Sequence, residues 1–226
     1  MGSTRRMCRV ESSRAKWNLS LSQGDPVWGV TSLAGEIFLL RKKGRDQVEV
    51  YDVITYCALR CLTVPNAHRF RPIDMISCAY YYCIYIVDKY KYMRKIDIKA
   101  PAFTRWALNG RPRGISVNAS HNVLVTYLEV QTIKEFSSHG ELIREITLPD
   151  DIINHCHTIQ SLDNTFIVCH GDPGDAVNRV CKISADGRHI VHSHGGQRGS
   201  VHGQYNVTWL SMITSLCLWW TFSISE

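Results

Sequence analysis

Apolar residues in this chain fall in short runs of strand length, and helical spacing is scarce. The clearest runs are four to seven residues long and rich in β-branched and aromatic side chains, with Gly, Asp, Asn, Ser or Pro in the gaps. They are Glu36–Leu40, Val48–Tyr51, Cys83–Val87, Val123–Tyr127, Leu142–Leu148, Phe166–Cys169 and His189–His192. The pattern predicts an all-β fold built from many short strands.

The runs recur as a unit of four predicted strands. The units open with short strands centred on Gly29, Asp74, Gly114 and Thr158, at successive spacings of 45, 40 and 44 residues. A period of this length with four strands per unit is typical of the blades of a β-propeller. We therefore predict an all-β β-propeller of four-stranded blades, with about four blades, as a partial or small propeller. The alternative is a β-sandwich with chance internal similarity.

The last two strands of the third and fourth units show the clearest internal match. Ser137 and Gly140 in the third unit align with Ser184 and Gly187 in the fourth, each pair 47 residues apart. Glycine supplies a positive φ at no steric cost, and a serine hydroxyl can bond the backbone of a turn. Both segments are therefore predicted to be hairpin turns.

Several segments also carry a family resemblance. Arg113–Ser116, Ile84–Asp88 and Gln47–Asp52 are similar to strands of the NHL-repeat β-propeller family, which includes animal NHL-like proteins and the propeller of tripartite-motif NHL proteins. The resemblance covers roughly residues 26–205 and implies a binding platform. NHL propellers usually have six blades, so it also implies that this chain is truncated. No Cys/His array with zinc spacing precedes residue 26, so ubiquitin-ligase activity is not implied.

Charge divides the chain into three parts. Residues 1–16 carry five basic and one acidic side chain, which leaves only +2 of the net charge of +6 for the rest. We predict a basic disordered arm over 1–25, NHL-like blades over 26–205, and an apolar tail over 206–226. The uncharged stretch 207–225 leaves a membrane anchor open, but its Ser and Thr content makes membrane insertion the weaker alternative.

Cysteine usage indicates the compartment. The nine cysteines are odd in number, irregularly spaced and without a CxxC pair, and several lie inside apolar runs. Free thiols in such positions behave as small hydrophobic residues and favour a reducing environment. The N-terminus has charge but no apolar segment of a secretory signal. A cytoplasmic location is therefore expected.

One stretch mixes aromatic and basic residues and is the sharpest candidate binding site. It consists of Lys89, Tyr90, Lys91, Tyr92, Arg94 and Lys95, and it follows three consecutive tyrosines at positions 80–82. Aromatic rings stack on bases and cations hold phosphate, so these six residues are candidates for RNA or partner binding. The alternative is that the tyrosines fill the core while the lysines decorate a hairpin.

Other clusters have weaker chemical interpretations. Histidines and cysteines gather late in the chain, and a zinc site there is conceivable, but paired imidazoles on one strand face also arise by chance. Asp172 and Asp175 flank Pro-Gly, which favours a turn over a calcium site of the kind in propeller lactonases. No nucleophile motif is present. We predict no metal, cofactor or catalytic residue.

These observations favour a non-catalytic binding or scaffold module that contacts a protein partner through propeller loops. RNA binding through a basic, aromatic face and a lactonase-type propeller hydrolase are the two alternatives. Because an open array of blades leaves two apolar faces uncovered, self-association is also expected.

Overall fold

The computed structural model describes residues 27–41, 47–64, 70–99, 102–127, 130–152, 155–172 and 177–195. Sixteen strands in these ranges form four antiparallel sheets of four strands each. No helix within the described ranges is long and apolar enough to span a membrane. The predicted arm over 1–25 and the tail over 206–226 lie outside the described residues, and so does the candidate anchor over 207–225.

Each sheet takes its strands in chain order, and we call the four sheets blades 1 to 4. Blade 1 consists of β1 (Val27–Leu33), β2 (Glu36–Arg41), β3 (Gln47–Asp52) and β4 (Ala58–Thr63). Blade 2 consists of β5 (Pro72–Cys78), β6 (Cys83–Asp88), β7 (Tyr92–Asp97) and β8 (Phe103–Ala107). Blade 3 consists of β9 (Pro112–Val117), β10 (Val123–Tyr127), β11 (Thr132–Phe136) and β12 (Leu142–Thr147). Blade 4 consists of β13 (His157–Gln160), β14 (Phe166–Asp172), β15 (Val177–Ile183) and β16 (Ile190–Gly195).

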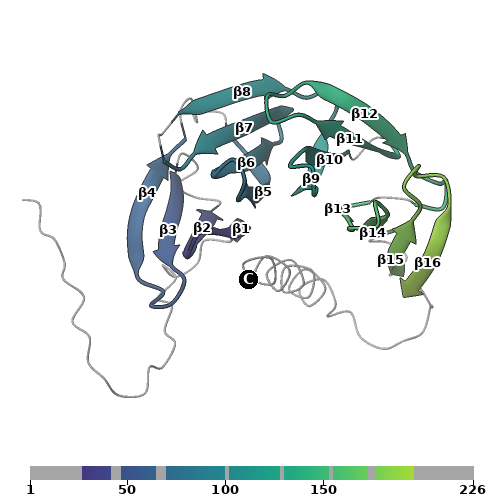
Figure 1. Cartoon of the computed structure of the whole chain (residues 1–226), viewed down its shortest axis with the longest axis horizontal. Coiled ribbons are helices and arrows are strands. Elements are labelled where there is room, and N and C mark those ends of the chain that lie inside the picture. The colour runs from purple at the N-terminus through teal and green to yellow at the C-terminus, as the bar shows by residue number, and fades with distance from the viewer. Residues whose placement is uncertain are drawn as a thin grey trace, which may run out of the picture.

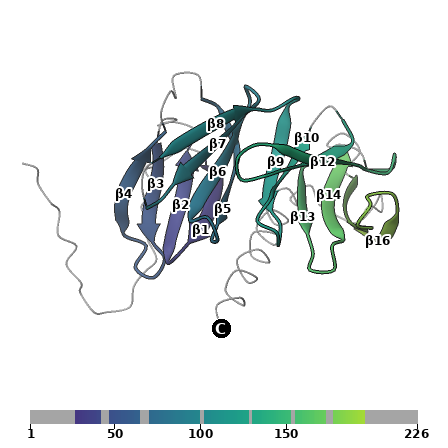
Figure 2. The ribbon, with the colours of Figure 1, turned by 45° about the horizontal axis from the view of Figure 1, so that its top comes forward.

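The blades follow one another along an arc, with the first strand of each on the inner side and the fourth on the outer side (Figure 1). The first strands β1, β5, β9 and β13 are neighbours in that order. Adjacent sheets stand face to face, as the tilted view in Figure 2 shows. The predicted all-β fold with four four-stranded blades is therefore confirmed, and the four predicted unit openings are the four inner strands.

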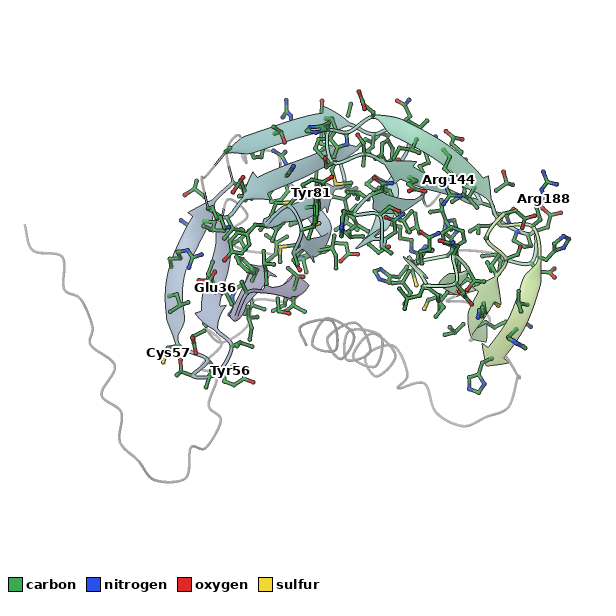
Figure 3. All side chains as sticks on the ribbon, viewed as in Figure 1. Glu36, Tyr56, Cys57, Tyr81, Arg144 and Arg188 are labelled. Carbon is green, nitrogen blue, oxygen red and sulfur yellow. The ribbon has the colours of Figure 1, made fainter. Side chains whose placement is uncertain are left out.

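The core is divided into three apolar layers, one between each pair of adjacent blades, and side chains fill these spaces in Figure 3. The second strands of blades 2 and 3 each contribute to two layers, since their residues alternate between the two faces. All residues of β6 and β10 are buried for this reason. Phe38 and Ile86 lie in the first layer, Tyr85 and Val125 in the second, and Phe166 in the third.

The inner strands are joined by side-chain hydrogen bonds across the blade boundaries. Ser77 Oγ donates to the carbonyl of Ser32 at 2.7 Å, and Ser116 Oγ donates to the carbonyl of Thr158 at 2.5 Å. The strands approach so closely that a Cβ added at Gly114 would lie 2.2 Å from the Cys156 carbonyl oxygen. A glycine is therefore required at the centre of β9.

The two predicted hairpin turns are confirmed. Gly140 and Gly187 have φ values of 89° and 80°, in the left-handed region that favours glycine. Ser137 Oγ accepts from the amides of His139 and Glu141, and Ser184 Oγ accepts from the amide of His189 at 3.0 Å. The two matched segments thus make the same turn in consecutive blades.

The turn predicted from Asp172 to Asp175 lies outside the described residues except for its first residue. Asp172 is the last residue of β14, because pairing with β15 extends to the register pair Asp172–Val177. The Pro-Gly sequence that suggested a turn begins one residue later, outside the described residues.

The close packing of the inner strands predicts an effect of Gly114→Ala. The added methyl group meets backbone rather than a movable side chain, so the free energy of unfolding should fall by about 1–3 kcal/mol in urea denaturation. Gly29→Ala is the matched control, because its Cβ would lie 3.0 Å from the Met75 Cβ, a contact that small shifts can relieve. Equal stability losses in the two variants would contradict this account.

Candidate functional site

The six residues of the predicted basic, aromatic stretch do not share one surface. Lys89, Tyr90 and Lys91 are exposed in the hairpin between β6 and β7, and Tyr92 and Lys95 are half-buried. Arg94 is buried between blades 1 and 2, where its guanidinium lies 4.6 Å from the centroid of the Phe70 ring. Side chains alternate along β7, so Lys95 lies on the other face, with Nζ 5.0 Å from the Tyr81 ring. Only the hairpin residues are freely presented.

Asp88 holds that hairpin together. Its carboxylate accepts from the amides of Tyr90 at 2.9 Å and Tyr92 at 3.1 Å, and it also pairs with Arg94 Nη2 at 3.0 Å. Asp88 and Arg94 are almost fully buried, so each offsets the cost of burying the other's charge. Arg94 therefore stabilises the hairpin through Asp88, and it is not available to an external ligand.

The Asp88–Arg94 contact occupies a position that recurs in every blade. One residue lies at the end of the apolar part of the second strand. The other lies on the third strand, two positions away from the residue directly opposite. The four pairs are Arg41–Glu49 (2.8 Å), Asp88–Arg94 (3.0 Å), Tyr127–Lys134 (Nζ 5.4 Å from the ring centroid) and His170–Cys181 (3.2 Å). The chemistry differs in each blade, and the charges of blade 2 are reversed in blade 1.

Blade 4 has the unusual member of this set. His170 Nε2 lies 3.2 Å from Cys181 Sγ, and both residues are buried. Burial and the nearby Arg179 lower the pKa of His170, and burial likewise lowers the pKa of His155. His170 Nδ1 is buried without a hydrogen-bond partner. Nowhere in the described parts of the chain do three His, Cys, Asp or Glu side chains gather in a way that could hold a metal.

A second aromatic group lies at the opposite end of β6, and it combines two of the tyrosines at 80–82 with His121, a contact that sequence reasoning missed. The Tyr80 ring stacks on the His121 ring with centroids 4.0 Å apart and planes within 9°. Tyr81, labelled in Figure 3, meets Tyr80 edge-on at 4.9 Å. Tyr80 is 68% exposed, and only Ile54 and Leu162 are more exposed among the large hydrophobic side chains of the described residues. We call Tyr80, Tyr81 and His121 the aromatic cluster.

The aromatic cluster joins two blades. Tyr80 and Tyr81 come from the hairpin between β5 and β6, and His121 comes from the corresponding hairpin between β9 and β10. The repeat was the only feature of the sequence that could have predicted this contact, because equivalent hairpins of consecutive blades lie side by side. Lys95 Nζ lies against the Tyr81 ring, so the cluster has a cation beside it. Lys99 Nζ lies 4.5 Å from the ring of Tyr82, which packs against the layer between blades 1 and 2 instead.

A buried carboxylate fixes the hairpin that carries His121. Glu135 Oε1 accepts from the side-chain amides of Asn118 at 2.8 Å and Asn122 at 2.7 Å, and Arg144 Nε donates to Oε2 at 2.6 Å. Burial by itself would raise the pKa of Glu135, but these hydrogen bonds outweigh it and the pKa is lowered. The carboxylate therefore stays ionised, and His121 is held in its left-handed conformation, with φ of 64°.

The inner strands bring together a third group of polar residues. Asp74 Oδ2 on β5 lies 3.6 Å from His157 Nδ1 on β13, and each side chain is about one quarter exposed. Asp74 also accepts from the amides of Met75 at 2.8 Å and Ile115 at 3.0 Å, which fixes the carboxylate. A carboxylate beside an imidazole can orient it for proton transfer.

No protein-family model and no curated protein matches this sequence. Solved structures do match. The hydrazine synthase of Kuenenia stuttgartiensis has a TM-score of 0.60 at 16% identity over 83% of this chain and 53% of its own. A streptogramin B lyase has a TM-score of 0.57 at 16% identity, over 77% of this chain and 55% of its own. A virginiamycin B lyase from Staphylococcus aureus, solved with quinupristin, has a TM-score of 0.57 at 12% identity, over 80% of this chain and 58% of its own.

This chain folds as a β-propeller. The similarity supports the fold alone, since every identity is low, and the chain spans little more than half the length of these structures. Membership of the NHL-repeat family stays a prediction.

The two buried histidines predict a loss of stability on mild acidification. His155 and His170 have lowered pKa values in the fold, so the unfolded chain takes up protons first as the pH falls below about 6.5. The free energy of unfolding should therefore decrease between pH 7.5 and 5.5, by at most about 1.4 kcal/mol per histidine for each pH unit. Urea titrations at several pH values measure this. If the free energy of unfolding of the His155→Gln, His170→Asn double variant falls with pH as steeply as that of the wild type, groups other than these histidines are responsible.

Proposed function

We propose that this chain is a non-catalytic binding module of the NHL type that holds a protein partner at the aromatic cluster. The observation that carries the proposal is the exposed Tyr80 ring, stacked on His121 of the next blade. Large aromatic side chains that are rigid before binding are favoured anchors in protein interfaces, since little conformational entropy is lost when they are covered. The proposed compartment is the cytoplasm, where the free cysteines would stay reduced.

Two features support a preorganised surface. Glu135 fixes the His121 hairpin through two hydrogen bonds, from Asn118 and Asn122, and Tyr80 is held between His121 and Tyr81. Function in propellers depends on such loops, while the sheets only position them. The rival RNA-binding proposal has less support, because Arg94 is enclosed between blades and Lys95 already lies against Tyr81.

Replacing Tyr80 tests the proposal. Immobilised full-length chain is used to retain cytoplasmic proteins, and the retained partner is then titrated against purified variants. Tyr80→Ala should weaken its binding by about 30-fold, the loss of a hot-spot side chain worth about 2 kcal/mol. Leu162→Ala is the matched control, because Leu162 is 70% exposed in the equivalent hairpin of blade 4.

The outcomes separate the candidates. Equal binding of the Tyr80→Ala and Leu162→Ala variants would remove the aromatic cluster from the proposal. A retained complex that disappears on nuclease treatment would favour the RNA-binding alternative instead.

A second candidate function, a propeller enzyme, is favoured by the Asp74–His157 contact on the inner strands. If His157 acts as a general base on a cyclic ester, His157→Gln should lower the hydrolysis rate by about 100-fold or more. His139→Gln, an exposed histidine in an outer hairpin, is the control. The assay is turnover of a panel of lactones, and a rate no greater than that of buffer, or equal rates in the two variants, would exclude this candidate.

A further inference from the structure

Two cysteines face each other at the end of the first hairpin of blade 2. Cys78 is the last residue of β5, Cys83 is the first residue of β6, and they are register partners in the antiparallel pair. Directly opposite residues on such strands have Cβ atoms about 4.5–5.5 Å apart on the same face. A disulfide needs a Cβ separation only slightly smaller, so a small movement of the strand ends suffices. Both thiols are free.

The two thiols are in direct contact and almost fully enclosed. Cys78 is 2% exposed and Cys83 is 0% exposed, in the apolar layer between blades 2 and 3. The Cys83 thiol donates a hydrogen bond to the Cys78 sulfur, and the amides of Tyr80 and Tyr81 also donate to it. These three donors stabilise a negative charge on the Cys78 sulfur, as the amides of a tight turn do for other anions.

The two sulfurs therefore differ in reactivity. The hydrogen bond from Cys83 is the main cause that lowers the pKa of Cys78, to about 6, against the opposing effect of burial. The same hydrogen bond and burial raise the pKa of Cys83. Cys78 has the thiolate character of an attacking sulfur, while Cys83 stays protonated beside it.

We infer that Cys78 and Cys83 form a reversible disulfide, with a hydroperoxide as the oxidant, Cys78 as the sulfur that attacks it and Cys83 as the resolving thiol. The register pairing carries this inference. It is independent of the proposed binding function.

The reaction takes place in two steps. The Cys78 thiolate attacks the terminal oxygen of the hydroperoxide, the O–O bond breaks, and the products are Cys78 sulfenic acid and hydroxide or alkoxide. The Cys83 sulfur then attacks the Cys78 sulfur, the S–O bond breaks, and water leaves with the thiol proton. Two thiols are oxidised by two electrons, and one hydroperoxide is reduced.

The other described cysteines lack this arrangement. Cys61 lies opposite Glu49, Cys181 lies opposite Val168 and Ser193, and Cys169 lies opposite Val180 and His157. Among the strands that the structure describes, Cys78 and Cys83 are the only two cysteines paired in register. The turn between them, residues 79–82, carries exposed Tyr80 at the rim, and the proposed reaction requires transient opening of this hairpin end to admit a small oxidant.

Peroxide titration of the folded full-length chain tests the inference. Remaining thiols are alkylated, and the peptides are identified by mass spectrometry. The peptide that contains Cys78 and Cys83 should lose about 2 Da and resist alkylation, and dithiothreitol should reverse both changes. Cys78 should react at least about tenfold faster than exposed Cys61.

Single variants separate the roles of the two sulfurs. In Cys83→Ser, Cys78 should stop at the sulfenic acid and be trapped by dimedone, while in Cys78→Ser position 83 should remain unmodified. Cys61→Ser, a change on the exposed strand β4, should leave disulfide formation unaltered.

Wild-type protein alone can overturn the inference. Oxidation of Cys61 ahead of Cys78, or a bond that forms only after denaturation in urea, would show that the folded pair is inert. Circular dichroism of each variant before oxidation shows whether it is folded, so a misfolded variant is not counted as evidence.

Discussion

The structure depends on the packing of one sheet against the next. The second strands of blades 2 and 3 have no polar face, because neighbouring blades cover both sides of them, as the fully buried β6 and β10 show. A single blade therefore cannot shield its own apolar residues from water, and each gains stability only from its neighbours. Three such layers hold the described blades together.

This packing also decides where polar chemistry can occur. Within the blades, polar side chains are tolerated at the strand ends, where a diagonal partner such as Arg94 for Asp88 satisfies them. The candidate sites lie in a rim hairpin and on the inner strands. The aromatic cluster occupies the rim and the Asp74–His157 contact the inner strands, and the cluster packs against the second apolar layer through Tyr81.

Features that depend on a single blade could be predicted from the sequence. Strand-length runs, the repeat period and the Ser137–Gly140 turn follow from local periodicity and turn chemistry, and the structure has all of them. Features that depend on the contact between two blades could not be predicted from the sequence. The stacking of His121 on Tyr80 and the enclosure of Arg94 over Phe70 require knowing which face of a strand meets the next sheet. Alternation along β7 then places Arg94 and Lys95 on opposite faces, although they are adjacent in sequence.

The recurring pair on the second and third strands also bears on how such a chain can be rearranged. The two ion pairs of this set are each satisfied within their own blade, and the Arg41–Glu49 pair has the reverse polarity of Asp88–Arg94. If blade 1 or blade 2 were duplicated or moved to another position in the order, both partners of its ion pair would move together. No unpaired charge would then be buried in the new layer. These ion pairs therefore do not limit the exchange of blades 1 and 2, which depends on the shape of their apolar faces.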